Sequence, residues 1–206
     1  MSIDVALFFL GLPAIGTAAA TIFLWEAFDP VVRSGFRGWP DATGRLVPLS
    51  SVMFVWMLIP ALPVVFGVVL WVISLRLDPV VDPTLRAAAA GFGLAGLGAA
   101  VGEGLAASRR VADLPRNRAV MGKVLIVMVG LETTFVFALT SSFLIIGALR
   151  TIPPPGSLAL GTLSLVGLTL GVHGLLALVG GMVVVCDLPD WAPLESVQLT
   201  LFTTSS

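Results

Sequence analysis

The fold is decided by the stretch Leu125-Ile126-Val127-Met128-Val129-Gly130-Leu131-Glu132-Thr133-Thr134-Phe135-Val136-Phe137. It lies inside a continuous apolar run, 120–149, and a helix needs roughly 20 apolar residues to cross the hydrocarbon core of a bilayer. One acid, Glu132, interrupts this run. A charge at mid-bilayer costs at least about 2.5–3.5 kcal/mol, so an intramembrane acid indicates a functional site. The alternative is a polar contact that holds helices together.

The composition places the chain among integral membrane proteins. It is 57% hydrophobic and 11% charged, with a mean hydropathy of +1.06, whereas about 25% of residues in soluble domains are charged. The basic residues are scattered, which argues against binding nucleic acid. A single cysteine and a single histidine exclude a disulfide framework and the spacing of a metal site. The first ten residues contain Asp4 and no Lys or Arg, so we expect a retained span rather than a cleavable signal.

Five apolar runs are long enough to span a membrane, and helices are expected because lipid offers no partner for a strand edge. The predicted fold class is an all-α membrane protein with tandem transmembrane helical hairpins (four spans) plus a fifth transmembrane helix. The runs are about 4–28, 50–75, 87–107, 120–149 and 158–186. Polar segments between them, including the turn 153–156, divide the chain into 1–78, 79–150 and 151–206. We expect the tail after the fifth run to be amphipathic or unstructured.

The distribution of Lys and Arg predicts the orientation in the membrane. The first and third loops carry eight of these residues, and the second and fourth carry three. The prediction is therefore that loops one and three face the cytoplasm, with the N-terminus outside or lumenal and the C-terminus cytoplasmic.

An internal repeat supports two hairpins of the same sense. The segment 11–21 (GLPAIGTAAAT) aligns with 93–103 (GLAGLGAAVGE), with small and apolar positions in common. The fifth run has a weaker echo, in which 172–177 (VHGLLA) resembles 102–107 (GEGLAA). The small residues Gly91, Ala95, Gly98 and Gly102 form a face that predicts close helix packing.

A second acid, Glu103, lies in the third run. Counted from the loop between the third and fourth runs, Glu103 and Glu132 are ten and thirteen residues deep, roughly 15 and 20 Å at about 1.5 Å per residue. The two carboxyls are therefore expected in one layer, where they cannot both stay ionised. Such a pair holds a proton, or a cation between its oxygens. Alternatively, Glu103 leans out toward the interface.

The segment 91–146 resembles the proteolipid c-type rotor subunit of rotary ATPases, in the F, V and A classes. The resemblance is carried by 93–98 (GLAGLG), 102–107 (GEGLAA), 114–118 (LPRNR) and 131–134 (LETT). The tandem hairpins resemble the duplicated V-type form. The first hairpin matches more loosely, because Val64 stands where the V-type pattern has an acid.

The resemblance implies the roles of individual residues. Glu132 matches the carboxylate that binds one H⁺ or Na⁺, and Glu103 matches a supporting position on the preceding helix. Thr133 matches an adjacent hydroxyl and Gly130 a backbone carbonyl ligand. If the ion is Na⁺, its ligands would come from Glu132, Glu103 and Thr133, since hard cations prefer oxygen. Phe137 replaces the usual tyrosine, which leaves H⁺ and Na⁺ both open.

The implied function is a rotor-ring subunit of an ion-translocating rotary ATPase, with ATP-driven pumping favoured because one hairpin of the two carries the acid. No catalysis by this chain and no cofactor are implied, only a transported H⁺ or Na⁺. The implied partners are membrane lipid, copies of this chain or related proteolipids in a ring, a stator subunit with an Arg, and central-stalk subunits at the cytoplasmic loops. The alternatives are a secondary transporter with an acidic ion site, although such repeats are typically inverted, and a non-transporting membrane scaffold.

Overall fold

The computed structural model describes residues 3–41, 43–77, 82–150 and 157–187. The predicted turn at 153–156, the boundary between 78 and 79, and the tail 188–206 lie outside these residues. Four of the described helical segments are long and apolar enough to cross a membrane, and part of a further helix, Ala159–Gly174, is shorter and apolar. The predicted all-α membrane fold is therefore confirmed.

The first hairpin is built from two interrupted helical segments. The first contains α1 (Ile3–Ala6), the π-turn η1 (Leu7–Gly11) and α2 (Leu12–Arg33), and the second contains α3 (Leu49–Leu58), the 3₁₀ turn η2 (Ile59–Ala61) and α4 (Leu62–Ser74). Both interruptions precede a proline, Pro13 or Pro63, because proline lacks the N–H that an α-helix needs. At the second break, the Thr17 hydroxyl of α2 donates to the Pro60 carbonyl oxygen at 2.6 Å.

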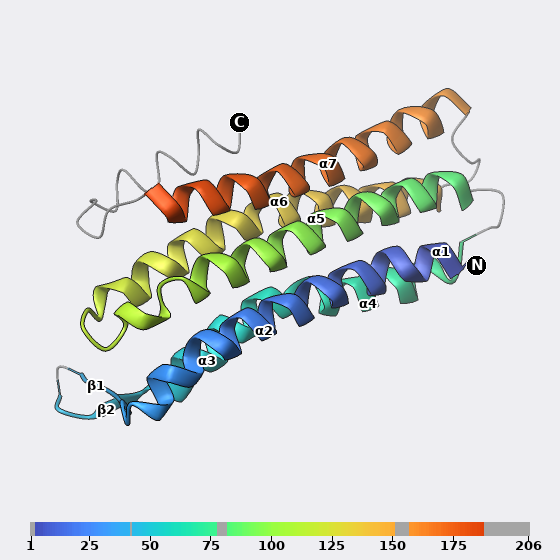
Figure 1. Cartoon of the computed structure of the whole chain (residues 1–206). Helices are drawn as coiled ribbons and strands as arrows, with labels where there is room; N and C mark the ends of the chain where they lie inside the picture. The colour runs from blue at the N-terminus through green and yellow to red at the C-terminus, as the bar shows by residue number, and fades with distance from the viewer. Residues whose placement is uncertain (1–2, 42, 78–81, 151–156, 188–206) are drawn as a thin grey trace.

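The second hairpin is more regular, and a final helix follows it. It contains α5 (Asp82–Ser108), the short turn η4 (Val111–Asp113) and α6 (Ala119–Leu149), and the last helix is α7 (Ser157–Asp187). Figure 1 shows α2, α5 and α7 running in the same direction, side by side, with α3–α4 and α6 running in the opposite direction. The chain thus forms a row of three parallel helices and a second row of antiparallel ones.

The α5 helix is central because its small residues let helices approach on two sides. Toward α2, a Cβ placed on Gly104 would lie 2.5 Å from the Cα of Ala20. Toward α7, a Cβ on Gly91 would overlap the carbonyl oxygen of Gly167, and a Cβ on Gly174 would lie 2.5 Å from the Cα of Ala95. The predicted packing face is thus in use at Gly91 and Ala95.

The two Arg-rich loops meet at one end of the molecule (Figure 1). The first contains a two-stranded antiparallel sheet, β1 (Gly38–Pro40) and β2 (Leu46–Pro48), which the apolar and polar patterns of the sequence did not predict. The Trp39 indole N–H donates to the Leu114 carbonyl of the other loop at 3.1 Å, and Arg118 Nη1 donates to the Pro40 carbonyl at 3.1 Å. The eight cations assigned to these loops therefore share one side.

The strands form because the connecting turn has its own hydrogen bonds. Asp41 accepts bonds from the Thr43 hydroxyl and from the backbone N–H groups of Thr43 and Arg45. The Thr43 hydroxyl is the main cause that holds the pKa of Asp41 below its usual value. Gly38 adopts φ +139°, and a Cβ there would overlap the Val47 carbonyl oxygen on the facing strand. Glycine is thus required at this close approach.

Replacing Gly91 tests whether the α5–α7 contact stabilises the fold. We expect Gly91→Ala to lower the free energy of unfolding by about 1–3 kcal/mol, because the new methyl group must displace the α7 backbone. The matched control is Gly147→Ala on α6, where a Cβ would meet nothing within 4 Å; the better helix propensity of alanine should there raise stability by up to about 1 kcal/mol. Thermal unfolding in detergent, followed by circular dichroism, measures both. Equal effects of the two changes would contradict the packing.

Candidate functional site

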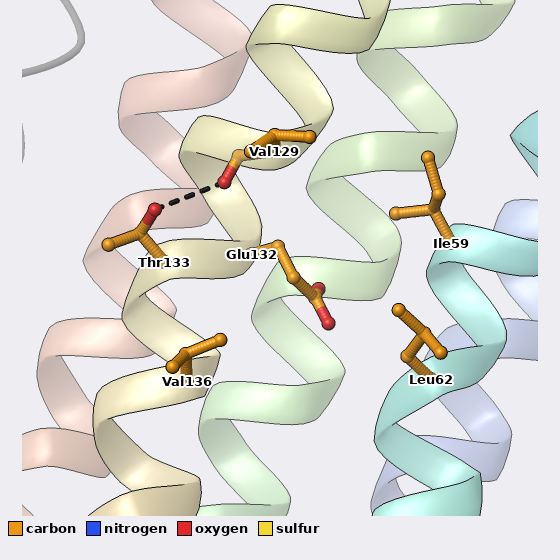
Figure 2. Close-up of a pocket in the computed structure, with 6 residues that line it drawn as sticks. All are labelled: Ile59, Leu62, Val129, Glu132, Thr133 and Val136. Atoms are coloured by element: carbon orange, nitrogen blue, oxygen red, sulfur yellow. Dashed lines mark hydrogen bonds between the residues drawn. The ribbon is translucent and has the colours of Figure 1, made fainter.

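Glu132 lies in the middle of α6, on a side that is partly covered. The helix runs thirteen residues before it and seventeen after it. Its side chain is half-buried, while the neighbouring Leu131 is buried and Thr133 is exposed. Figure 2 shows the Glu132 carboxyl directed away from α6 toward the adjacent helices, while the Thr133 side chain points to the opposite side. The acid therefore lies at a seam between helices.

Glu103 faces this seam from α5 and has no exposed surface. Its carboxyl lies close enough to that of Glu132 for the two groups to interact directly. The structure thus brings together the two acids that the sequence placed at similar depths. The alternative in which Glu103 leans toward water does not fit a side chain that is 0% exposed.

Three carboxyl oxygens of the pair lack donors from the protein. Both oxygens of Glu103 and Oε2 of Glu132 are buried without a hydrogen-bond partner. Two carboxyls bond to each other only when a proton lies between them, and two buried carboxylates repel strongly. Buried polar atoms are otherwise nearly always satisfied. The arrangement can therefore hold a shared proton or a small cation that oxygen ligands suit.

A groove of about 240 Å³ connects Glu132 to the outside of the molecule. Figure 2 shows the residues that line it, from η2 and α4 on one side and from α6 on the other. They are Ile59, Leu62, Val129, Glu132, Thr133 and Val136. The contribution of Ile59 and Leu62 was not predicted; the signal that could have found it is the proline pair that breaks the second span beside them. The wall is apolar except for Glu132 and Thr133.

The other predicted site residues are less closely connected to the pair. Thr133 is one of the residues that line the groove, and its hydroxyl donates to the Val129 carbonyl at 3.1 Å. Gly130 lies two residues before Glu132 on the same helix and is partly buried. The buried Thr134 belongs to the 131–134 motif, although no role was assigned to it, and it donates to the Leu131 carbonyl at 2.8 Å. Among the described residues, no group of three His, Cys, Asp or Glu side chains gathers around a possible metal ion.

Fold and site together define a class: a helical membrane protein with a paired carboxyl site at the centre of one hairpin. Residues 87–145 match the family model of the ATP synthase C subunit. The match contains both acids and covers most of the hairpin of α5 and α6, so this segment of the chain is similar to that family. Neither a curated protein nor a solved structure shows a significant match.

Replacing Glu103 distinguishes a site that binds a ligand from a contact that stabilises the fold. We expect Glu103→Leu to leave thermal stability unchanged or to raise it, because the carboxyl receives no donor from the protein and apolar replacement of buried charged groups is often favourable. The control Thr17→Val removes the bond to the Pro60 carbonyl and should cost about 1 kcal/mol. Thermal unfolding in detergent gives both values. A larger loss for Glu103→Leu than for Thr17→Val would indicate a structural acid.

Proposed function

We propose that this protein is a rotor-ring proteolipid subunit of a rotary ATPase, and that it translocates H⁺ or Na⁺ at Glu132. The observation that carries the proposal is the pair of Glu103 and Glu132, in which both Glu103 oxygens and Oε2 of Glu132 are buried and have no protein donor. The match of residues 87–145 to the ATP synthase C subunit supports it, since that segment contains both acids. A structural contact alone would not leave its polar atoms unsatisfied.

The mechanism follows from the surroundings of Glu132. While the site faces lipid, the carboxyl must be neutralised, because a bare charge at this depth costs several kcal/mol. Glu103 supplies a second set of oxygens that shares the proton or cation. Thr133 lines the groove, and its hydroxyl oxygen, with the Gly130 carbonyl, is proposed as a further ligand. An Arg on a stator subunit would displace the ion by offering a competing positive charge.

The remaining partners are assigned by chemistry and position. The end with the two Arg-rich loops is proposed to face the cytoplasm and to contact the central stalk, so that the N-terminus is outside or lumenal and the C-terminus inside. Copies of the chain form the ring, with lipid around it. In the first hairpin, Val64 stands at the position that matches the family acid, and Thr21 stands at the position that matches Glu103.

The proposed direction is ATP-driven pumping. When fewer ions cross per turn, the energy of a given number of ATP molecules can move each ion against a steeper gradient.

Labelling with dicyclohexylcarbodiimide, which attacks protonated carboxyls in apolar surroundings, tests the site. We expect the adduct on Glu132, mapped by mass spectrometry of purified protein, because the groove admits an apolar reagent to that carboxyl. Glu132→Gln should lose the label. The matched control Glu26→Gln, which changes an exposed acid of α2, should keep it. An unlabelled Glu132 in folded wild-type protein would rule out the rotor mechanism and favour a non-transporting scaffold.

The same reaction with and without Na⁺ identifies the ion. At fixed pH and ionic strength, protection by millimolar Na⁺ indicates a Na⁺ site, whereas protection by raising the pH, with Na⁺ having no effect, indicates H⁺. For a Na⁺ site, we expect Thr133→Val to raise the Na⁺ concentration that gives half-protection about tenfold, because the variant loses one oxygen ligand. A tenfold change in affinity corresponds to roughly 1.4 kcal/mol of binding free energy. Thr140→Val serves as the matched control: the Thr140 hydroxyl bonds a carbonyl of its own helix, that of Val136, as the Thr133 hydroxyl does, but Thr140 does not line the groove. Identical shifts for both variants would remove Thr133 from the site.

A further inference from the structure

We infer that α7 is a third helix of the inner wall of the ring, and that its outer side packs against α2 of the next copy of this chain. The inference rests on the proposed ring and specifies how copies join in it. It starts from the row of α2, α5 and α7, which run in parallel (Figure 1). In this row, the step from α5 to α7 repeats the step from α2 to α5.

The face that α2 turns to α5 corresponds to the face that α5 turns to α7. Pro13, Gly16 and Ala20 of α2 contact α5: Pro13 lies under Gly96, Gly16 under Leu97, and Ala20 under Gly104. In the internal repeat, in which Gly93 follows Gly11 by 82 residues, Pro13 corresponds to Ala95. Ala95 is the residue that α5 presents to Gly174 of α7. At this position, the two helix-to-helix contacts therefore use equivalent residues.

This equivalence fixes the register of α7. Gly174 lies on Ala95 as Gly96 lies on Pro13, so Gly96 and Gly174, 78 residues apart, are equivalent. The sequences agree at this spacing, with identical residues at 93/171, 96/174, 97/175, 99/177, 101/179 and 102/180. The echo that matches 102–107 with 172–177 uses a spacing of 70, about two helical turns away. The packing supports the spacing of 78.

The outer row follows the same plan. The segment α3–α4 contacts both α2 and α5, and α6 contacts both α5 and α7. Each outer helix thus covers the seam between two successive wall helices. For example, the Thr17 hydroxyl of α2 bonds to the Pro60 carbonyl of the outer segment, and Ser142 of α6 bonds to the Ala88 carbonyl at 3.4 Å. Helix α7 therefore occupies a wall position and not a position outside the ring.

The two ends of the row expose the faces that further steps would use. Some residues of α5 contact α2, and the internal repeat gives each of them an equivalent on α2. These equivalents are exposed; they are Ala14, Ile15, Ala18 and Ile22. Other residues of α5 contact α7, and the spacing of 78 gives them equivalents on α7 itself. These equivalents include Leu165, Val166 and Thr169, which are also exposed. A contact between unlike faces that repeats by rotation closes into a ring. The occupant of each open face is therefore the other face on a neighbouring copy.

The internal repeat predicts which residues meet at the interface between copies, because each contact between α5 and α7 has an equivalent there. The contact between Ala88 and Gly167 becomes a contact between Val166 of one copy and Leu7 of the next. The contact between Gly91 and Gly171 becomes one between Thr169 and Gly11. Leu7 and Val166 are 53% and 44% exposed in the single chain, so they are available to meet.

Disulfide cross-linking in native membranes tests the interface. In a Cys186→Ser background, we expect the double variant Leu7→Cys, Val166→Cys to form a ladder of covalent multimers of the 21.4 kDa chain on oxidation. The second pair, Gly11→Cys with Thr169→Cys, should do the same. The matched control is Val69→Cys with Val166→Cys. Val69 is exposed on α4, at about the depth of Leu7 because Gly67 contacts the Phe9 carbonyl, and this pair should give no ladder.

A fourth pair separates the possible failures. If α7 lies outside the wall, α5 meets α2 of the next copy directly, and Leu7→Cys with Ala88→Cys forms the ladder instead; that result overturns the inference and keeps the ring. If none of the pairs forms a ladder, although each variant still accepts the carbodiimide label at Glu132, both the inference and the ring are overturned. A ladder from either α7 pair, absent from the control, supports the inference.

Discussion

The backbone of α5 lies against neighbouring helices on two sides, and the positions of the other elements depend on this. Helix pairs in membranes gain little from burying apolar surface, because lipid is as apolar as the helix, so close packing and interhelical hydrogen bonds must hold them together. Gly104 gives α5 its contact with Ala20, and Gly91 gives it the contact with α7. With α5 held on both sides, α3–α4 and α6 fill the seams behind it.

This packing also explains the direction of the Glu103 side chain. Residue 104 is in contact with α2, and successive residues of a helix are turned by about 100°. Glu103 is thereby directed away from α2 and meets α6, which carries Glu132. The approach of the helices is close enough to leave Glu103 without exposed surface. The same contacts that build the wall therefore bring two carboxyls together in a buried layer, where neither Glu103 oxygen receives a donor from the protein.

The sequence predicted the helices and the meeting of the two acids because both depend on local counts. Apolar run lengths determine the spans, and residue counts from the loop determine the depths of Glu103 and Glu132. Residue counts do not give the direction in which a side chain points around its helix. Thr133 is an example: it lines the same groove as Glu132, but its side chain is turned to the opposite side, and its hydroxyl bonds the Val129 carbonyl (Figure 2). The β1–β2 sheet was missed for a related reason, since its register depends on the Asp41 turn and on contacts with the distant residue Leu114.

The register of α7 shows where sequence comparison needs the structure. Glycine-rich helices resemble one another at several spacings, so similarity alone does not choose between 70 and 78 residues. The packing favours 78, because Gly174 lies on Ala95 in the same way as Gly96 lies on Pro13. In that register Gly181 corresponds to Glu103, as Thr21 does in the first hairpin. In the proposed ring, a wall made of three such helices would carry one acid pair per chain, which would widen the spacing between ions around the ring. Moving one charge across 100 mV takes about 2.3 kcal/mol, so a ring with fewer charges per turn can work with the same rotary energy against a larger potential.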